Sequence, residues 1–269
     1  MTHDMPTPQR KKPEYLNRTD GLKIAYHHVP GKPSDVQAPD TPGVMFLGGF
    51  MSDMTGTKAT HLEAHCIRQG VAYTRFDYSG HGQSSGKFAD GTIGKWASDA
   101  IAVLDEITSG PQILVGSSMG GWIMLLATLA RKERIAGLVG IAAAPDFTED
   151  LMWAQFSDDQ KKVIMEKGAL IEPTEYGDDP YTITRALIED GREQLLLRKP
   201  IDLACPVRLV QGMQDPDVPW QTAIRLTEAL ATDDVRVDLI KSGDHRLSEP
   251  DQLDVITKHL DEMIAKTAG

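Results

Sequence analysis

The stretch Ile113-Leu-Val-Gly-Ser-Ser-Met-Gly-Gly-Trp122 carries most of the information about the fold. It begins as a short apolar run typical of a buried strand, and after a glycine-rich turn it continues into the apolar run 122–130, which indicates a helix. Residues 116–120 fit the pattern G-x-S-x-G, in which a serine occupies a strained turn between a strand and a helix. The pattern predicts that Ser118 is a nucleophile, whereas Ser117 lies one residue too early.

The alternative for this stretch is a turn of small residues that only packs a helix against a strand. G-x-S-x-G is expected about 0.1 times by chance in a chain of this composition, so the five residues alone are moderate evidence. Their position between an apolar strand and an apolar helix strengthens the prediction of a nucleophile. The start of a helix also favours the negative charge that a reacting serine develops.

Short apolar runs alternate with helical patterns along most of the chain, which predicts an α/β fold with a mostly parallel central sheet flanked by helices. An N-terminal hairpin over 16–29, turning at Asp20-Gly21, comes before this alternation. The expected strands are 44–47, 71–76, 112–115, 135–141, 207–211 and 235–240, and the expected helices are 59–68, 96–107, 122–130, 222–230 and 253–265.

Residues 146–200 interrupt this alternation. The interval is rich in acidic residues, has helical patches at 160–168 and 181–197, and offers no convincing central strand. We therefore expect three parts: residues 1–145 as the first part of the core, 146–200 as a helical cap, and 201–269 as the second part of the core. A cap is expected over the carboxyl ends of the strands, where open α/β sheets bind their ligands.

Composition excludes several other classes of protein. The net charge of −11 over 269 residues provides no basic surface for nucleic acid. The longest apolar run, 122–130, is far shorter than the roughly 20 residues that span a bilayer. Two cysteines are too few for a disulfide framework, and residues 1–12 contain no apolar targeting segment. These features predict a cytoplasmic protein.

A serine nucleophile needs a general base and an acid that orients the base. His245 follows the expected strand 235–240 in a loop just ahead of the last helix, whereas His81 precedes the serine in the sequence. Asp215 directly follows the strand 207–211 and is preferred to its rival Asp217 because of the phasing of the surrounding glycine and proline residues. The order Ser118, Asp215, His245 places each residue in the loop after its own strand, so all three are expected to meet at one edge of the sheet.

Stabilising the oxyanion of such a reaction requires two positioned N–H groups, each contributing roughly 3 kcal/mol to lowering the barrier. We predict that one is the backbone amide of Met119, the residue after the nucleophile. The other is predicted at the amide of Phe50, in the loop Gly48-Gly49-Phe50 after the strand 44–47. The alternative for this loop is a flexible glycine turn.

No metal and no organic cofactor is expected. His61, His65 and Cys66 resemble a metal site, but a zincin helix needs glutamate directly after the first histidine. The glycine-rich segment 80–86 lacks the Lys-Ser/Thr ending of a phosphate-binding loop.

Several segments together resemble the abhydrolase (α/β-hydrolase) family, in particular its mitochondrial palmitoyl-protein thioesterases and acyl-glucuronide esterases. The resemblance runs over about 44–250 and rests on 49–59, 75–80, 94–96, 110–122 and 218–220. It implies the α/β-hydrolase fold, the catalytic residues Ser118, Asp215 and His245, and substrates that are thioesters or activated esters.

The expected function is therefore hydrolysis of a carboxylic ester or thioester, either of a small molecule or of an acylated protein. Two alternatives remain on the same fold: hydrolysis of a C–C or peptide bond, and a ligand receptor that keeps the three residues without turnover. A dehalogenase is disfavoured because its nucleophile is aspartate where this chain has Ser118.

Overall fold

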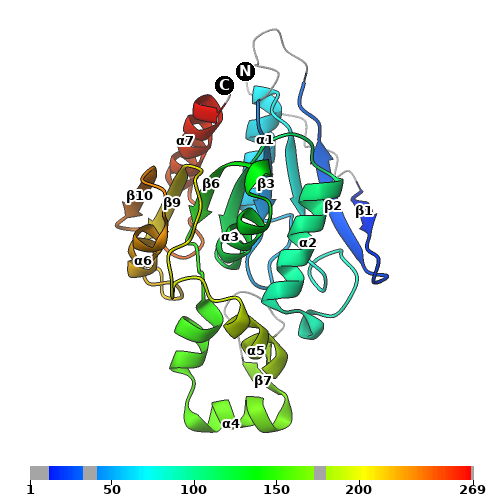
Figure 1. The fold of residues 1–269 in the computed structure, drawn as a ribbon, viewed down its shortest axis with the longest axis vertical. Coiled ribbons are helices and arrows are strands. Elements are labelled where there is room, and N and C mark those ends of the chain that lie inside the picture. Colours follow the sequence, from blue (N-terminus) through cyan, green and yellow to red (C-terminus); the bar gives the residue numbers. More distant parts are fainter. Residues whose placement is uncertain (1–11, 33–40, 173–179, 268–269) are drawn as a thin grey trace, which may run out of the picture.

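The computed structural model describes residues 12–32, 41–172 and 180–267. Its centre is an eight-stranded sheet in the order β1-β2-β4-β3-β5-β6-β9-β10 (Figure 1). The six strands from β4 to β10 pair in parallel, and the N-terminal hairpin β1–β2 is added antiparallel to β4. The predicted fold class is therefore confirmed, including the hairpin that turns at Asp20-Gly21.

The strands and helices have the following bounds. The strands are β1 (Glu14–Asn17), β2 (Lys23–Val29), β3 (Gly43–Leu47), β4 (Tyr73–Phe76), β5 (Gln112–Ser117), β6 (Ile135–Ile141), β7 (Ala169–Glu172), β8 (Tyr181–Thr184), β9 (Val207–Gly212) and β10 (Val235–Ile240). The helices are α1 (Thr57–Gln69), α2 (Ile93–Glu106), α3 (Met119–Ala130), α4 (Asp158–Lys167), α5 (Arg185–Glu193), α6 (Gln221–Ala229) and α7 (Pro250–Thr267), with the short helices η1 (Phe88–Asp90), η2 (Lys132–Arg134) and the π-helix η3 (Thr148–Trp153).

Helices cover both faces of the sheet, so its central strands are buried on both sides. Along β3, Met45 and Leu47 belong to the core cluster that includes residues of α2, α3 and α6, whereas Val44 and Phe46 belong to the cluster that includes residues of α1 and α7. This alternation explains why the strand is continuously apolar in sequence. Within the described residues, no helix is long and apolar enough to cross a membrane.

The segments 146–172 and 180–200, which the sequence predicts to form a cap and which are called the cap below, project from the carboxyl end of the sheet (Figure 1). It contains η3, α4, α5 and the two-stranded antiparallel sheet β7–β8. The prediction of a helix over 181–197 is wrong at both ends, because the first four residues form β8 and α5 ends at Glu193. Aromatic and β-branched side chains favour a strand there, and Thr184 then ends the strand and caps α5 by accepting a hydrogen bond from the Leu187 amide.

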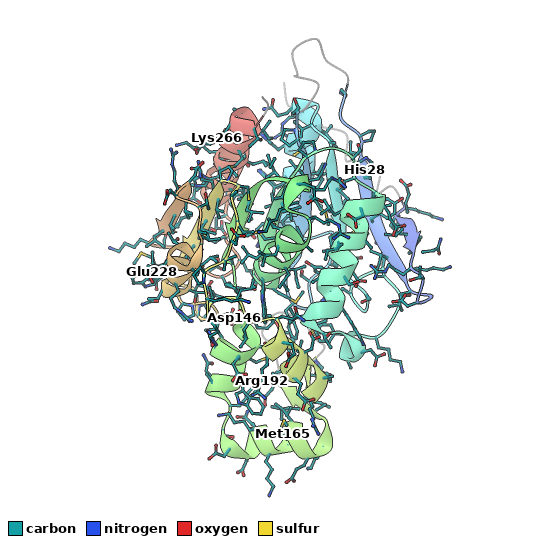
Figure 2. All side chains as sticks on the ribbon, in the orientation of Figure 1. His28, Asp146, Met165, Arg192, Glu228 and Lys266 are labelled. Atoms are coloured by element: carbon teal, nitrogen blue, oxygen red, sulfur yellow. The ribbon has the colours of Figure 1, made fainter. Side chains whose placement is uncertain are left out.

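A buried carboxylate ties the two ends of the cap together. Asp146 is fully buried where the cap joins the body (Figure 2), with a φ of 61°. Its oxygens accept hydrogen bonds from the amides of Leu196 and Leu197, at 2.8 and 2.9 Å. The residue that opens the cap therefore satisfies two backbone groups of the segment that closes it.

Replacing this carboxylate should loosen the cap. In Asp146→Asn, one accepting oxygen becomes an amide donor that faces a backbone N–H, so we expect a loss of about 1–3 kcal/mol in the free energy of unfolding. Asp150→Asn is the matched control, because Asp150 forms more exposed ion pairs with Arg198 and Arg225, which contribute about 1 kcal/mol or less. Urea unfolding measures both, and equal losses in the two variants would contradict this role of Asp146.

Candidate active site

Ser118 lies at the sharp turn between β5 and α3. Its backbone has φ 54° and ψ −120°, a conformation that L-residues rarely adopt. A Cβ on Gly120 would lie 2.1 Å from the Leu47 carbonyl oxygen, and one on Gly116 would lie 2.4 Å from the Gly120 carbonyl oxygen. The glycines are therefore required by close approaches of the backbone, as the pattern predicted.

The structure brings Ser118, His245 and Asp215 together from three separate loops. His245 Nε2 lies 3.1 Å from Ser118 Oγ, and His245 Nδ1 lies 2.8 Å from Asp215 Oδ2. These distances allow a proton to pass from the hydroxyl to the imidazole while the carboxylate fixes the ring.

The side chain of Asp215 is fully buried, and its carboxylate accepts several hydrogen bonds. Oδ1 accepts hydrogen bonds from the amides of Asp217 and Val218, and Oδ2 accepts one from Gln211 Nε2 at 3.0 Å in addition to the His245 contact. Burial by itself raises the pKa of Asp215, but the hydrogen bonds from His245 and the two amides outweigh it and hold the pKa below its usual value. The carboxylate is therefore ionised at neutral pH.

The rival Asp217 is exposed and donates its own amide to Asp215.

The contact of Gln211 with Asp215 was not predicted from the sequence. The available signal was a polar residue at the carboxyl end of β9, a buried strand that also contains Arg208, and Gln211 is 1% exposed there.

The loops that carry Asp215 and His245 are joined through their backbones. The Gln214 amide donates to the Gly243 carbonyl oxygen at 2.9 Å. A Cβ on Gly212 would lie 2.3 Å from that same oxygen, so only glycine permits the two loops to approach this closely.

Of the two residues predicted to supply N–H groups, Met119 directly follows Ser118 as the first residue of α3, and Phe50 lies in the loop after β3 and lines the same pocket as Ser118. Among the residues that the structure describes, neither amide donates to a protein acceptor.

The side chain of Phe50 also contacts the cap, which the sequence did not reveal. Its ring meets Phe147 and Tyr181 of the cap in edge-to-face contacts, with centroids 5.7 and 5.3 Å apart.

A buried histidine holds the loop that carries Phe50. The Met51 amide donates to His81 Nε2 at 3.3 Å, while His81 Nδ1 lies 3.3 Å from the Ser79 carbonyl oxygen. Burial lowers the pKa of His81 to about 4, so the imidazole is neutral at pH 7. A neutral ring can accept from Met51 and donate to Ser79 at once. His81 therefore positions this loop and does not contact Ser118 in the described structure.

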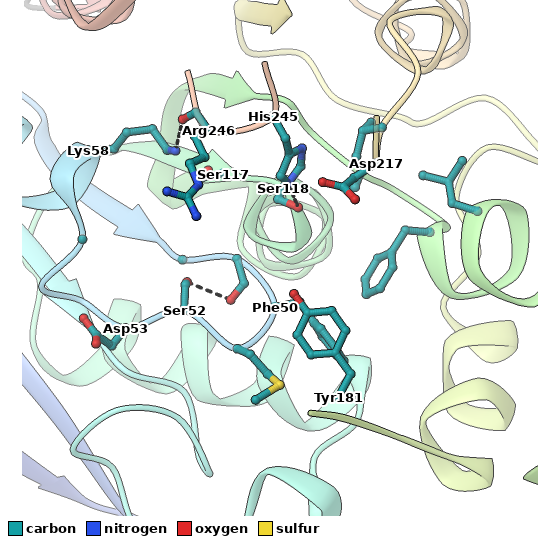
Figure 3. A pocket seen from close by; sticks show the side chains of 18 of the residues that line it. Phe50, Ser52, Asp53, Lys58, Ser117, Ser118, Tyr181, Asp217, His245 and Arg246 are labelled. Carbon is teal, nitrogen blue, oxygen red and sulfur yellow. Dashed lines mark hydrogen bonds between the residues drawn. The ribbon is translucent and has the colours of Figure 1, made fainter. Parts of the chain in front are cut away.

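A pocket of about 680 Å³ opens beside Ser118 (Figure 3). Its walls differ in chemistry: one side is polar and the cap side is apolar. The polar wall includes Ser52, Asp53, Lys58 and Arg246, and the apolar wall includes Phe50, Phe147, Leu151, Met152 and Tyr181.

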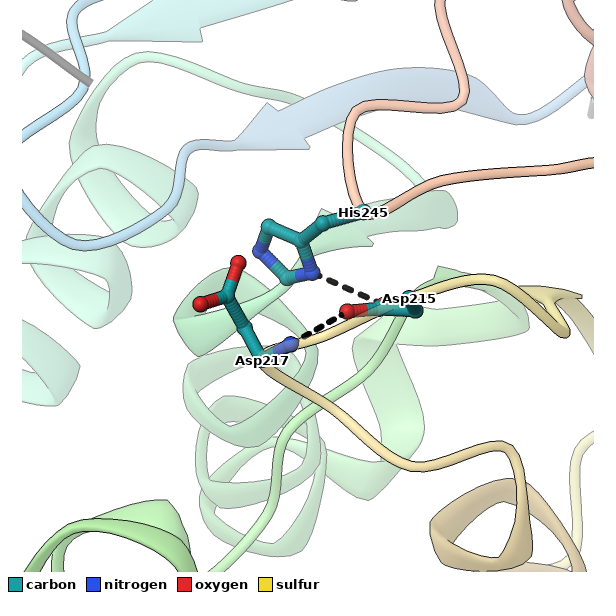
Figure 4. A group of neighbouring side chains, drawn as sticks. All are labelled: Asp215, Asp217 and His245. Atoms are coloured by element: carbon teal, nitrogen blue, oxygen red, sulfur yellow. Dashed lines mark hydrogen bonds and ion pairs between the residues drawn. The ribbon is translucent and has the colours of Figure 1, made fainter. Parts of the chain in front are cut away.

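One group of possible metal ligands lies in the described part of the chain: Asp215, Asp217 and His245, with ligand atoms within 4.8 Å of one another (Figure 4). Two of the three are already hydrogen-bonded to each other. The other oxygen of Asp215 accepts two backbone amides, so the contacts of this carboxylate are those expected of a proton relay.

The sheet order, the helices on both faces and the cap over the carboxyl ends of the strands define an α/β hydrolase. A family model described as Hydrolase_4, serine aminopeptidase S33, matches residues 44–174. The mitochondrial palmitoyl-protein thioesterase ABHD10 of Mus musculus is 40% identical over 259 residues, which are 96% of this chain and 84% of that protein.

Two solved structures are similar over nearly the whole chain. A putative hydrolase from Agrobacterium vitis S4 is 42% identical with a TM-score of 0.87, covering 94% of this chain and 98% of that one. Alpha/beta hydrolase domain-containing protein 10 from mouse is 38% identical with a TM-score of 0.85, covering 95% and 99%. The chain belongs to the ABHD10 branch of the α/β-hydrolase family, and it is a hydrolase of the esterase and thioesterase type.

The prediction of a cytoplasmic location is wrong, because the mammalian ABHD10 relatives are named as mitochondrial proteins. The prediction rested on two cysteines and on residues 1–12, of which 1–11 lie outside the described residues. Cysteine usage reports the redox state of a compartment rather than its identity.

Gln211 should support hydrolysis through Asp215. Gln211→Met keeps the length of the side chain but removes the donor to Asp215 Oδ2, so the pKa of Asp215 should rise and the orientation of His245 should weaken. We expect kcat/KM for a simple ester to fall about tenfold, the value of one hydrogen bond to a charged group. Thr222→Val, a buried polar change on α6, is the control for general damage to the fold. A Gln211→Met variant as active as the parent would contradict this role.

His81 should make the folded state sensitive to acid. Its pKa is about 4 when folded and about 6.5 when unfolded, so between these values the unfolded chain binds the proton and stability falls as the pH falls. Urea unfolding from pH 7 to pH 4.5 measures the loss. In His81→Gln, whose amide oxygen can still accept from Met51, the dependence in this window should be shallower. An unchanged slope would show that other groups cause it.

Proposed function

We propose that this protein is a serine thioesterase and esterase that forms an acyl-enzyme on Ser118. The observation that carries the proposal is the continuous set of contacts from Asp215 to His245 to Ser118, at 2.8 and 3.1 Å. The ABHD10 relatives are named as palmitoyl-protein thioesterases, which supports a thioester of a long acyl chain as the substrate class.

In the first step Ser118 Oγ attacks the acyl carbonyl carbon and His245 Nε2 takes the hydroxyl proton. The negative charge moves to the carbonyl oxygen, which accepts hydrogen bonds from the amides of Phe50 and Met119. As the carbonyl re-forms, the bond to the leaving sulfur or oxygen breaks, and His245 gives its proton to that atom.

In the second step water attacks the acyl-enzyme. His245 takes a proton from the water, the bond to Ser118 Oγ breaks, and the proton returns to the serine as the acid leaves. Asp215 stays ionised throughout and stabilises the protonated imidazole. The two N–H groups remain available because no protein acceptor in the described structure competes for them.

The pocket supports an apolar acyl group. The wall formed by Phe147, Leu151, Met152 and Tyr181 offers aromatic and aliphatic surface, and burial of each methylene of a chain contributes about 0.8 kcal/mol. Leu151 and Met152 lie on η3, and Tyr181 lies on β8, so the cap supplies the surface that would select the acyl chain.

Replacing the nucleophile tests the proposal directly. Ser118→Ala should lower kcat for acyl thioesters and p-nitrophenyl esters at least about 10³-fold and abolish labelling by a fluorophosphonate, because the attacking oxygen is gone. Ser117→Ala is the matched control, since it removes the adjacent hydroxyl and should keep both properties. Undiminished hydrolysis by Ser118→Ala would overturn the assignment of the nucleophile. A parent protein that hydrolyses neither substrate would overturn the proposed activity.

A further inference from the structure

The central sheet ends at β10, which is the outermost strand on one side of the molecule (Figure 1). Within the described residues it pairs only with β9. The carbonyl oxygens of Asp234 and Ile240, at the two ends of the strand, accept hydrogen bonds from the β9 side. Backbone groups of successive residues in a strand point to opposite sides, so every second residue directs its N–H and C=O groups away from β9. These residues are Val235, Val237 and Leu239.

Charges of opposite sign lie at equal distances from Val237 along this edge. Arg236 and Asp238 flank it directly, and Asp233 and Lys241 follow further out on either side. All four charged residues are exposed. A second copy of the strand that runs antiparallel and is centred on the same valine therefore meets the first with opposite charges facing each other.

The backbone and the charges favour the same register. In an antiparallel pair centred on Val237, this residue exchanges hydrogen bonds with its own counterpart, and Val235 exchanges them with Leu239 of the second copy. These are the residues whose backbone groups point outward. Arg236 then lies directly opposite Asp238 of the second copy, in a pair without backbone hydrogen bonds, where side chains come closest. Registers centred on Arg236 or Asp238 also satisfy the backbone, but they place like charges opposite each other.

Contacts within the chain leave these side chains able to pair across the edge. Arg236 Nη1 donates to Glu262 Oε1 at 2.8 Å, and His259 Nε2 lies 2.9 Å from Asp238 Oδ2. The side chains of Arg236 and Asp238 are still 63% and 54% exposed. A guanidinium has several donors and a carboxylate several acceptor positions, so one contact does not saturate either group. Asp234, which has no opposite charge in this register, has cationic partners in its own chain.

We propose that β10 forms the interface of a homodimer, in which two copies of the strand pair antiparallel around a two-fold axis at Val237 and join two sheets into one. Charged side chains on an edge strand commonly discourage pairing. Here they disfavour the registers centred on Arg236 and Asp238 and favour the one centred on Val237. The pairing also covers Leu239, which is 37% exposed, with Val235 of the second copy. The inference does not depend on the proposed acyl-enzyme reaction.

Sedimentation velocity of the parent protein tests whether the dimer forms. An interface one strand wide is smaller than that of a standard stable complex, so we expect reversible association with a dissociation constant of about 10–100 µM. The average mass should therefore rise from that of one chain toward that of two between about 2 and 200 µM. Raising the salt from about 0.05 to 0.5 M should weaken the association, because the facing charges are exposed.

Charge reversal tests the register. Arg236→Asp and Asp238→Arg each place like charges opposite each other on both sides of the axis, so each variant should self-associate at least about tenfold more weakly than the parent. In an equimolar mixture of the two variants every facing pair again has opposite signs, and association should return to about the parent level. Arg185→Asp is the matched control, because it reverses an arginine in a similarly exposed ion pair, with Glu189 on α5, and should associate like the parent.

Urea unfolding of each variant separates a loss of association from a loss of folding. Asp233→Lys and Lys241→Asp repeat the experiment, alone and mixed, at exposed positions just outside β10. A parent protein that stays monomeric over the whole concentration range would overturn the dimer. A dimer that survives the charge reversals would overturn it too, since it would use a different surface, and so would a mixture that associates no better than its separate variants.

Discussion

The buried, ionised carboxylate of Asp215 is the constraint on which the candidate active site depends. A buried charge without partners would cost several kcal/mol, so the surrounding chain must supply donors. Two come from the backbone immediately after Asp215, one from Gln211 and one from His245. The imidazole of His245 is therefore one of four donors that stabilise the ionised carboxylate. Because its Nδ1 is hydrogen-bonded to Asp215, the ring is oriented with Nε2 toward Ser118.

Such a site also requires the chain to come unusually close to itself at the carboxyl ends of the strands. The backbone of Gly120 lies close to the carbonyl oxygen of Leu47, and the backbone of Gly212 lies close to the carbonyl oxygen of Gly243. The first approach places Ser118 next to the loop that carries Phe50, and the second places Asp215 next to His245. The strained backbone of Ser118 is held by hydrogen bonds from its amide to Ile141 and from Ala144 to its carbonyl oxygen. The rigid parallel sheet provides the support that keeps this conformation.

Much of the fold and of the site geometry could be predicted because the relevant signals are local. The continuous apolar runs reveal strands buried on both faces, and the glycines around Ser118 reveal the turn between β5 and α3. What the sequence could not reveal depends on the directions of side chains, both within one loop and between distant segments. Gln211 reads as an ordinary polar residue until its amide is seen beside Asp215, and His65 reads as a helix surface although it contacts Asp261 of α7 at 2.6 Å.

The role of His81 is a second feature that could not be predicted from the sequence. In the sequence it competes with His245 as a possible general base, since both are histidines in loops after strands. The structure separates them by environment: His245 is partly exposed beside Ser118, whereas His81 is 3% exposed among Tyr78, Phe88 and Trp96. An imidazole with a pKa of about 4 accepts a proton poorly near neutral pH, so it would be a weak base. The same neutrality lets it accept from the Met51 amide and fix the loop beside Ser118. Burial therefore decides that His245 and not His81 can act as a general base. The positions of the two histidines along the chain do not show this difference in burial.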